Sequence, residues 1–95
     1  MKVRYSPEAI ADLRRVVDFV EAENPFAARR IALDLQEGVD RLKRFPKIGL
    51  PVLKAPDPEL IRDLYIGRYT ARYLIADETI YILRIWHNKE NEKNF

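Results

Sequence analysis

Residues 6–46 read SPEAIADLRRVVDFVEAENPFAARRIALDLQEGVDRLKRFP, and this stretch decides the fold. Ser6-Pro7 and Asn24-Pro25 each combine a favoured helix N-cap with the proline that suits the first helical position. Apolar residues then recur at spacings of three and four, with Asp12 on the polar side of the first helix. Phe45-Pro46 ends the second helix, because proline disfavours helical backbone at the residue before it. Since the connection is tight, residues 7–45 are predicted to form a helical hairpin.

The sequence on either side of the hairpin predicts an antiparallel sheet. Residues 1–5 are expected to form a short strand. Residues 46–59 contain four prolines and a glycine and are expected to form a loop without regular elements. Residues 60–87 hold three β-rich stretches separated by two short turns, which predicts three sequential antiparallel strands. Residues 88–95 are a polar tail.

The predicted order β-α-α-β-β-β describes a single α+β domain over residues 1–95, with the hairpin packed on one face of the sheet. Hydrophobic residues make up 47% of the chain and charged residues 34%, as is typical of a soluble globular domain. No apolar stretch is long enough to span a bilayer, and the N-terminus lacks the apolar segment of a secretory signal. A cytoplasmic location without membrane contact is therefore expected.

Residue counts also limit the chemistry. The chain has no cysteine and one histidine, which excludes disulfides, thiolate metal sites and multi-histidine sites. No metal or cofactor is expected. The 17 basic and 15 acidic residues give a net charge of +2, and no basic arm is present. Because nucleic-acid surfaces usually carry a larger clustered excess of positive charge, direct binding to nucleic acid is not favoured.

The last strand lacks the alternation expected of a sheet with one covered face. Its odd positions carry Tyr81, Leu83 and Ile85, and its even positions carry Ile80, Ile82 and Trp86. If the odd set faces the helices, the even set forms an uncovered apolar patch. A protein partner is therefore expected over Ile80, Ile82 and Trp86. The parity of the pattern does not decide which set faces the helices, so Tyr81, Leu83 and Ile85 could be the uncovered set instead. The outer groove of the helix pair is an alternative site for the partner.

Several segments together resemble the RelE/ParE superfamily of type II toxin–antitoxin toxins. They are Ser6-Pro7 after the opening strand, the loop Phe45-Pro46-Lys47-Ile48-Gly49 and the ending Ile82-Leu83-Arg84-Ile85-Trp86-His87. The resemblance, which covers nearly the whole chain, implies an intracellular toxin encoded beside an antitoxin that folds onto it and neutralises it. It implies contact with DNA only indirectly, through the antitoxin. The expected partner on the apolar face is then the cognate antitoxin.

The superfamily contains ribosome-dependent mRNA endonucleases of the RelE type and ParE-type toxins that poison DNA gyrase. RNA cleavage needs a general base, a general acid and cations for the developing phosphate charge. In the YoeB-like branch these come from a strand-end His followed by Tyr, a strand Arg and a loop Glu. His87 matches that pattern, whereas Asn88, Thr70 and Val52 stand at or near the other three positions.

The missing residues favour a ParE-like toxin that inhibits gyrase by binding, with no catalytic residue of its own. The alternative is an mRNA interferase, an endoribonuclease that would use His87, Arg84 and Arg72. Five polar residues are predicted to contact the target: Arg68, Arg72, Arg84, His87 and Lys89. The structural alternative for these residues is a strand-end histidine hydrogen-bonded to the backbone, with arginines that pair with Asp63 and Asp77.

Overall fold

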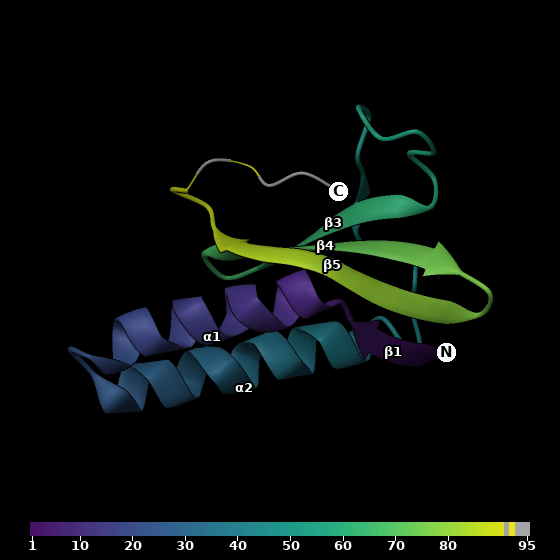
Figure 1. Cartoon of the computed structure of the whole chain (residues 1–95). Helices are drawn as coiled ribbons and strands as arrows, with labels where there is room; N and C mark the ends of the chain where they lie inside the picture. Colours follow the sequence, from purple (N-terminus) through teal and green to yellow (C-terminus); the bar gives the residue numbers. More distant parts are fainter. Residues whose placement is uncertain (91, 93–95) are drawn as a thin grey trace.

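The structure is a computed structural model that describes residues 1–90 and residue 92. Its elements follow the order β1 (Lys2–Tyr5), α1 (Pro7–Glu21), α2 (Pro25–Arg41), β2 (Leu50–Pro51), β3 (Ile61–Ile66), β4 (Tyr69–Ala76) and β5 (Thr79–His87). The strands form one mixed sheet in the order β1-β5-β4-β3-β2, in which β1 is parallel to β5 and the other pairs are antiparallel. Both helices lie on one face of it (Figure 1), so the predicted α+β architecture is confirmed.

The helical hairpin begins where the cap residues predict. The Ser6 side chain accepts a hydrogen bond from the Ala9 N–H at 3.0 Å, and the Asn24 side chain accepts one from the Ala27 N–H at 3.0 Å. The second helix ends at Arg41, before the predicted Phe45, because the chain tightens into turns with i to i−3 hydrogen bonds over residues 42–44. None of the helices in the described part of the chain is long and apolar enough to cross a bilayer.

A β-bulge in β5 changes which side chains face the helices. Tyr73 of β4 pairs with Ile82, and Arg72 pairs with Arg84, so Leu83 is an extra residue. Positions before and after it therefore differ in parity, and Ile80, Ile82 and Ile85 all lie in the main core. The prediction that Ile80, Ile82 and Trp86 form an uncovered patch is wrong, because all three are buried. In the alternative set, Ile85 is buried, whereas Tyr81 and Leu83 are half-buried.

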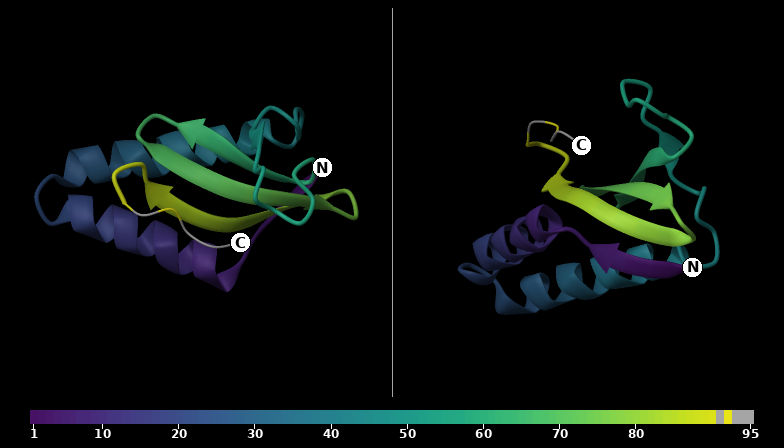
Figure 2. Two further views of the ribbon diagram at one scale, coloured as in Figure 1. Left: turned by 90° about the horizontal axis from the view of Figure 1, so that it is seen from above. Right: turned by 45° about the vertical axis from the view of Figure 1, so that its right-hand side comes forward.

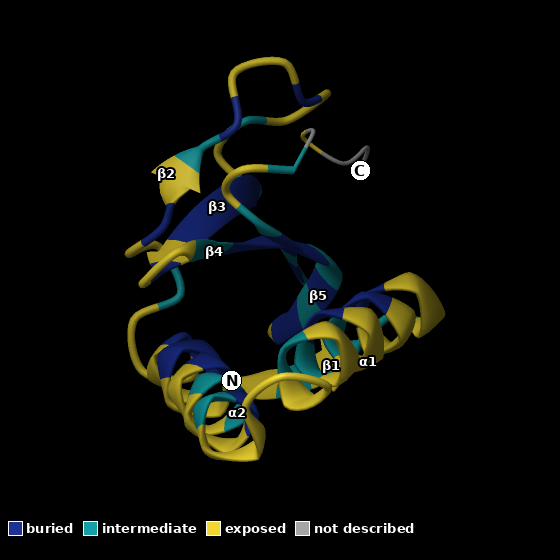
Figure 3. Cartoon of the chain, turned by 90° about the vertical axis from the view of Figure 1, so that its left-hand side faces the viewer, coloured by how far each residue is buried: buried dark blue, intermediate teal, exposed yellow. Residues whose placement is uncertain are grey.

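The sheet face away from the helices is largely covered by the chain itself. Val52 and Ala55, in the proline-rich loop, pack on Ile61 and Leu74 and form a second small core. The same loop contains the two-residue strand β2, where no regular element was predicted. Figure 3 shows the buried sheet beside the largely exposed outer surfaces of the helices. A partner is therefore not needed to bury this part of the sheet.

Helix α1 completes the edge of β5. Pairing of β1 with β5 ends at Tyr5 and Ile82. Beyond that point the Ser6 hydroxyl donates to the Leu83 carbonyl at 2.9 Å, and the Asp12 carboxylate accepts from the Ile85 N–H at 2.9 Å. Asp12 is only 4% exposed, which corrects its prediction as a residue of the polar helix face.

Substitution of Gly49 by alanine is expected to lower the free energy of unfolding by about 1–3 kcal/mol, because it overpacks a closed site. A Cβ at Gly49 would lie 2.7 Å from the Tyr73 hydroxyl and 2.9 Å from the Asp63 carbonyl oxygen. Gly49 also donates its N–H to that hydroxyl at 3.0 Å, and the hydroxyl donates to the Pro46 carbonyl at 2.6 Å. The measurement is urea unfolding.

The matched control is Gly67→Asn. Gly67 has a φ of +57°, which asparagine tolerates, and nothing lies within 4 Å of a Cβ there. This variant is expected to stay within about 0.5 kcal/mol of the wild type. Equal unfolding midpoints for Gly49→Ala and the wild type would contradict the described anchoring of the loop.

Candidate functional site

Three of the five predicted target contacts come together at one end of the sheet. Arg68 lies in the β3–β4 turn, and its carbonyl accepts from the Asn88 N–H at 2.8 Å, which joins this turn to the end of β5. Tyr69 pairs with His87, and their rings meet edge to face with centroids 5.1 Å apart. The side chains of Arg68 and Lys89 are exposed, and neither has an ion-pair partner within residues 1–90 and 92. This end of the sheet therefore presents two exposed cationic side chains, Arg68 and Lys89, beside the rings of Tyr69 and His87.

Arg72 is placed differently, within the sheet and away from solvent. Its guanidinium contacts the two Asp63 carboxylate oxygens at 2.8 and 2.9 Å and a Glu92 oxygen at 2.6 Å. It also lies over the Trp86 ring, 5.2 Å from the centroid, and Arg72 is 2% exposed. The hydrogen bonds to Asp63 raise the pKa of Arg72 despite its burial. The predicted pairing with Asp63 is confirmed, and the guanidinium is not presented to a target.

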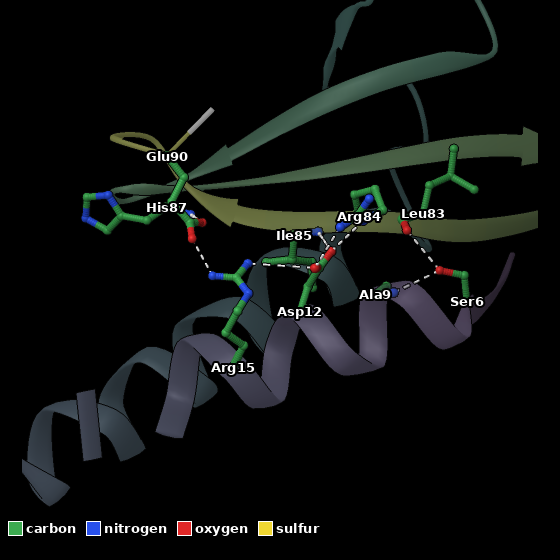
Figure 4. A network of polar contacts seen from close by, with 9 residues as sticks. All are labelled: Ser6, Ala9, Asp12, Arg15, Leu83, Arg84, Ile85, His87 and Glu90. Carbon is green, nitrogen blue, oxygen red and sulfur yellow. Dashed lines mark hydrogen bonds and ion pairs between the residues drawn. The ribbon is translucent and has the colours of Figure 1, made fainter. Parts of the chain in front are cut away.

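Arg84 is held by Asp12 of helix α1, which is neither of the two acids, Asp63 and Asp77, that were predicted to pair with the arginines. Its guanidinium donates to the Asp12 carboxylate at 2.8 and 3.0 Å, as Figure 4 shows. Burial raises the pKa of Asp12, but the hydrogen bonds from Arg84 and the Ile85 N–H and the nearby cations outweigh it, so the pKa is lowered overall. Arg15 extends the network by an ion pair with Glu90. Arg84 therefore fastens β5 to α1.

His87 has the backbone contacts expected of a strand-end histidine. Its Nδ1 accepts from the Lys89 N–H at 3.0 Å, and its own N–H donates to the Glu90 carboxylate at 2.8 Å. Adjacent residues of a strand point to opposite faces, so His87 lies on the helix side while Trp86 lies with Arg72 on the other. The sheet thus separates His87 from Arg72 and leaves the proposed nuclease set unassembled. Within the described ranges, no group of three or more His, Asp or Glu side chains could hold a metal ion.

The sequence suggested the outer groove of the helix pair as an alternative antitoxin site, but it did not indicate the space between the far half of α1 and the sheet. There a groove of about 570 Å³ lies between α1 and the sheet end, with a largely apolar lining that includes Val16, Phe19, Val20, Tyr69 and His87. The signal was present in the sequence, because the apolar stripe of the first helix continues to Val20. The sequence does not show at which residue of α1 the sheet stops covering that apolar stripe.

Comparisons with known proteins agree with this architecture. The family model described as the ParE toxin of the type II toxin–antitoxin system parDE matches residues 3–92. Toxin RelE2 of Caulobacter vibrioides is 34% identical over 86 residues, which cover 90% of this chain and 93% of that protein. A solved chain of the chromosomal ParDE TA system from P. aeruginosa shares the fold, with a TM-score of 0.76 and 24% identity over 92% of this chain and 95% of that one. The chain therefore belongs to the ParE toxin family of type II toxin–antitoxin systems.

Proposed function

We propose that this toxin inhibits DNA gyrase by binding it, without cleaving a nucleic acid itself. As a type II toxin it has a cognate antitoxin, which neutralises it in this proposal. One observation carries the proposal: the sheet lies between His87 and Arg72, so the only histidine cannot act together with that arginine on one phosphodiester. General acid–base cleavage needs these groups around the same phosphate.

The ion pairs of Arg72 and Arg84 support the same conclusion. Arg72 and Arg84 are both occupied by carboxylates, so neither offers an uncompensated charge for a transition-state phosphate. Freeing either one would leave a buried carboxylate without its partner, which is costly. Arg68, His87 and Lys89 remain as the contacts proposed for gyrase. They lie at one end of the sheet, where a large protein surface can approach.

The purified toxin is expected to inhibit supercoiling by reconstituted gyrase and to leave ribosome-bound transcripts intact. Both assays should use one preparation, so that differences in folding cannot separate the results. The double variant Arg68→Glu, Lys89→Glu is expected to weaken gyrase inhibition at least about tenfold, because the two exposed cations steer and contact the target. The control is the double variant Arg14→Glu, Arg29→Glu, which makes the same change in net charge on the exposed surfaces of α1 and α2. Codon-specific mRNA cleavage with unaffected supercoiling would contradict the proposal and favour the interferase.

A further inference from the structure

Residues 87–90 form a tight turn at the end of β5, here called the strand-end turn, beside the β3–β4 turn (Figures 1 and 2). The Glu90 N–H donates to the His87 carbonyl at 2.8 Å, and the His87 N–H donates to the Glu90 carboxylate at 2.8 Å. The Asn88 N–H donates to the Arg68 carbonyl at 2.8 Å, and the Lys89 N–H donates to Nδ1 of His87 at 3.0 Å. Each backbone N–H of the strand-end turn is therefore bonded, which holds the turn in one conformation.

Side chains fasten the strand-end turn to two other elements. The Thr70 hydroxyl of β4 donates to the Asn88 side-chain oxygen at 2.6 Å, and Arg15 of α1 forms an ion pair with the Glu90 carboxylate. The Tyr69 ring meets the imidazole of His87 edge to face. The imidazole is therefore held by the fixed backbone of the turn, by the bond to its Nδ1 and by the ring beside it.

The bond to Nδ1 determines where the neutral imidazole of His87 carries its hydrogen. A neutral imidazole has one N–H group, and the nitrogen that accepts a hydrogen bond is not the one that carries the hydrogen. Because Nδ1 accepts from the Lys89 N–H, we assign the hydrogen to Nε2 from this hydrogen bond. The strand-end turn therefore fixes His87 as a donor through Nε2–H.

This donor lies where a partner can reach it. His87 is half-buried, and Figure 4 shows its ring pointing away from the Asp12–Arg84 pair. The ring lines two hollows at this end of the sheet, the groove of about 570 Å³ together with Lys89 and a second one of about 320 Å³ together with Arg68. Within residues 1–90 and 92, Nε2 makes no hydrogen bond. The Nε2–H group is therefore open to an acceptor from outside the described part of the chain.

The surroundings of Nε2–H select the acceptor. Arg68 and Lys89 line the two hollows that His87 shares, and neither has an ion-pair partner among the described residues. A donor flanked by two exposed cations favours an anionic oxygen. The groove beside it is lined largely by apolar side chains such as Val16 and Phe19, and the chain as a whole carries a net charge of only +2. Both features suit a carboxylate on a protein surface better than a nucleic-acid phosphate.

We propose that His87 is a specificity-determining contact that donates its Nε2–H to a carboxylate side chain of gyrase, and that the strand-end turn positions the ring for this role. The inference rests on the proposed function, because it names the chemical group that this end of the sheet recognises on gyrase. No proton is transferred in such a contact. His87 therefore acts as a hydrogen-bond donor and not as a general acid or base.

Two substitutions separate the roles of the two ring nitrogens. Asparagine at position 87 can accept from the N–H two residues on, as Nδ1 does, but none of its atoms reaches the position of Nε2. His87→Asn is therefore expected to weaken the inhibition of supercoiling at least about tenfold, as for a lost hydrogen bond to a charged group. Glutamine is longer, and its amide N–H reaches the position of Nε2. His87→Gln is expected to lose less than about fivefold, which is the cost of ordering one longer side chain.

Thr70→Val is the matched control, because it removes a hydrogen bond of the strand-end turn without changing the imidazole. It is expected to change the inhibition less than about threefold. Circular dichroism and thermal unfolding confirm the fold of each variant before the assay. If His87→Asn fails to fold, His87→Phe replaces it, because phenylalanine keeps a ring beside Tyr69 without either nitrogen, and the same loss is expected.

Nuclear magnetic resonance measures the tautomer directly, without gyrase. The chain has one histidine, so isotope-labelled protein gives a single pair of ring-nitrogen signals. We expect the hydrogen on Nε2 and a scalar coupling between the Lys89 N–H and Nδ1, which reports the hydrogen bond. A hydrogen on Nδ1 in the neutral ring would overturn the inference whatever the inhibition assay shows.

A wild-type toxin that does not inhibit gyrase overturns the proposed function, and the inference with it. If the wild type inhibits and His87→Asn inhibits equally well, His87 is not the contact, while the proposed function stands. Equal losses in His87→Asn and His87→Gln also overturn the inference, because the donor is then not what gyrase recognises. Binding of both toxins to gyrase is measured with and without DNA. A loss in His87→Asn that occurs only with DNA assigns the acceptor to a DNA phosphate and contradicts the carboxylate.

Discussion

Replacement of Asp12 by alanine is expected to lower the free energy of unfolding by about 2–3 kcal/mol. Asp12 is 4% exposed, and its carboxylate accepts hydrogen bonds from the Arg84 guanidinium and the Ile85 N–H. The alanine variant leaves the Ile85 N–H buried without an acceptor and removes the counter-charge of Arg84. The expected cost lies below that of a fully buried pair, because the Arg84 side chain is 25% exposed.

Urea unfolding at neutral pH measures this loss. Asp18→Ala is the matched control, because Asp18 lies on the same helix with an exposed side chain and no ion pair within the described residues. It is expected to change stability by less than about 0.5 kcal/mol. Similar unfolding midpoints for the two variants would show that Asp12 does not fasten β5 to α1.

The contribution of Asp12 to the free energy of unfolding should depend on pH. Because its pKa is lowered in the folded protein, its contribution is fully present above the unfolded value of about 3.9 and is lost as the pH falls through the folded value. The stability difference between the wild type and Asp12→Ala should therefore narrow in acid. The hydrogen bond to Arg72 lowers the pKa of Glu92 as well, so the difference between variants is the informative quantity.

Replacement of Asp63 by alanine is expected to cost about 3 kcal/mol, because it leaves the guanidinium of Arg72 buried without its main counter-charge. The paired change Asp63→Leu, Arg72→Met is expected to recover most of that loss, since apolar residues of similar size often replace a buried ion pair without penalty. Urea unfolding of the single and double variants measures the coupling.

The folded double variant also tests the function. If Arg72 only supports the sheet, the variant should inhibit gyrase as strongly as the wild type does. A stable double variant that no longer inhibits gyrase would indicate that Arg72 contacts the target, which would contradict its proposed role in the sheet alone.

The sequence predicted those features that depend on neighbouring residues. Cap residues located the starts of both helices, and short turns located the boundaries of the three main strands. The prediction that Arg68, His87 and Lys89 lie near one another also depends on short connections, because successive antiparallel strands return the chain to one end of the sheet.

Features that depend on distant residues escaped prediction. The bulge at Leu83 reverses the side-chain parity of β5 beyond Ile82, so Ile82 and Ile85 share the core face while Trp86 lies with Arg72 on the other face. Ile80 and Ile82, predicted to contact the antitoxin, are buried because they pack with helix residues in the core. Arg84 pairs with Asp12 across 72 positions of sequence, whereas the acids predicted as partners of the arginines, Asp63 and Asp77, lie in or beside the strands. Residue type alone also assigned Asp12 to solvent, because buried aspartates are rare unless paired.

The parallel pairing of β1 with β5 joins Lys2 to Thr79, nearly the full span of the chain. A nascent chain on the ribosome therefore cannot close its sheet until β5 has been synthesised and has left the exit tunnel. Interrupted synthesis would yield fragments that lack both the completed sheet and the surface at its end. The host cell would thus be spared the activity of truncated translation products.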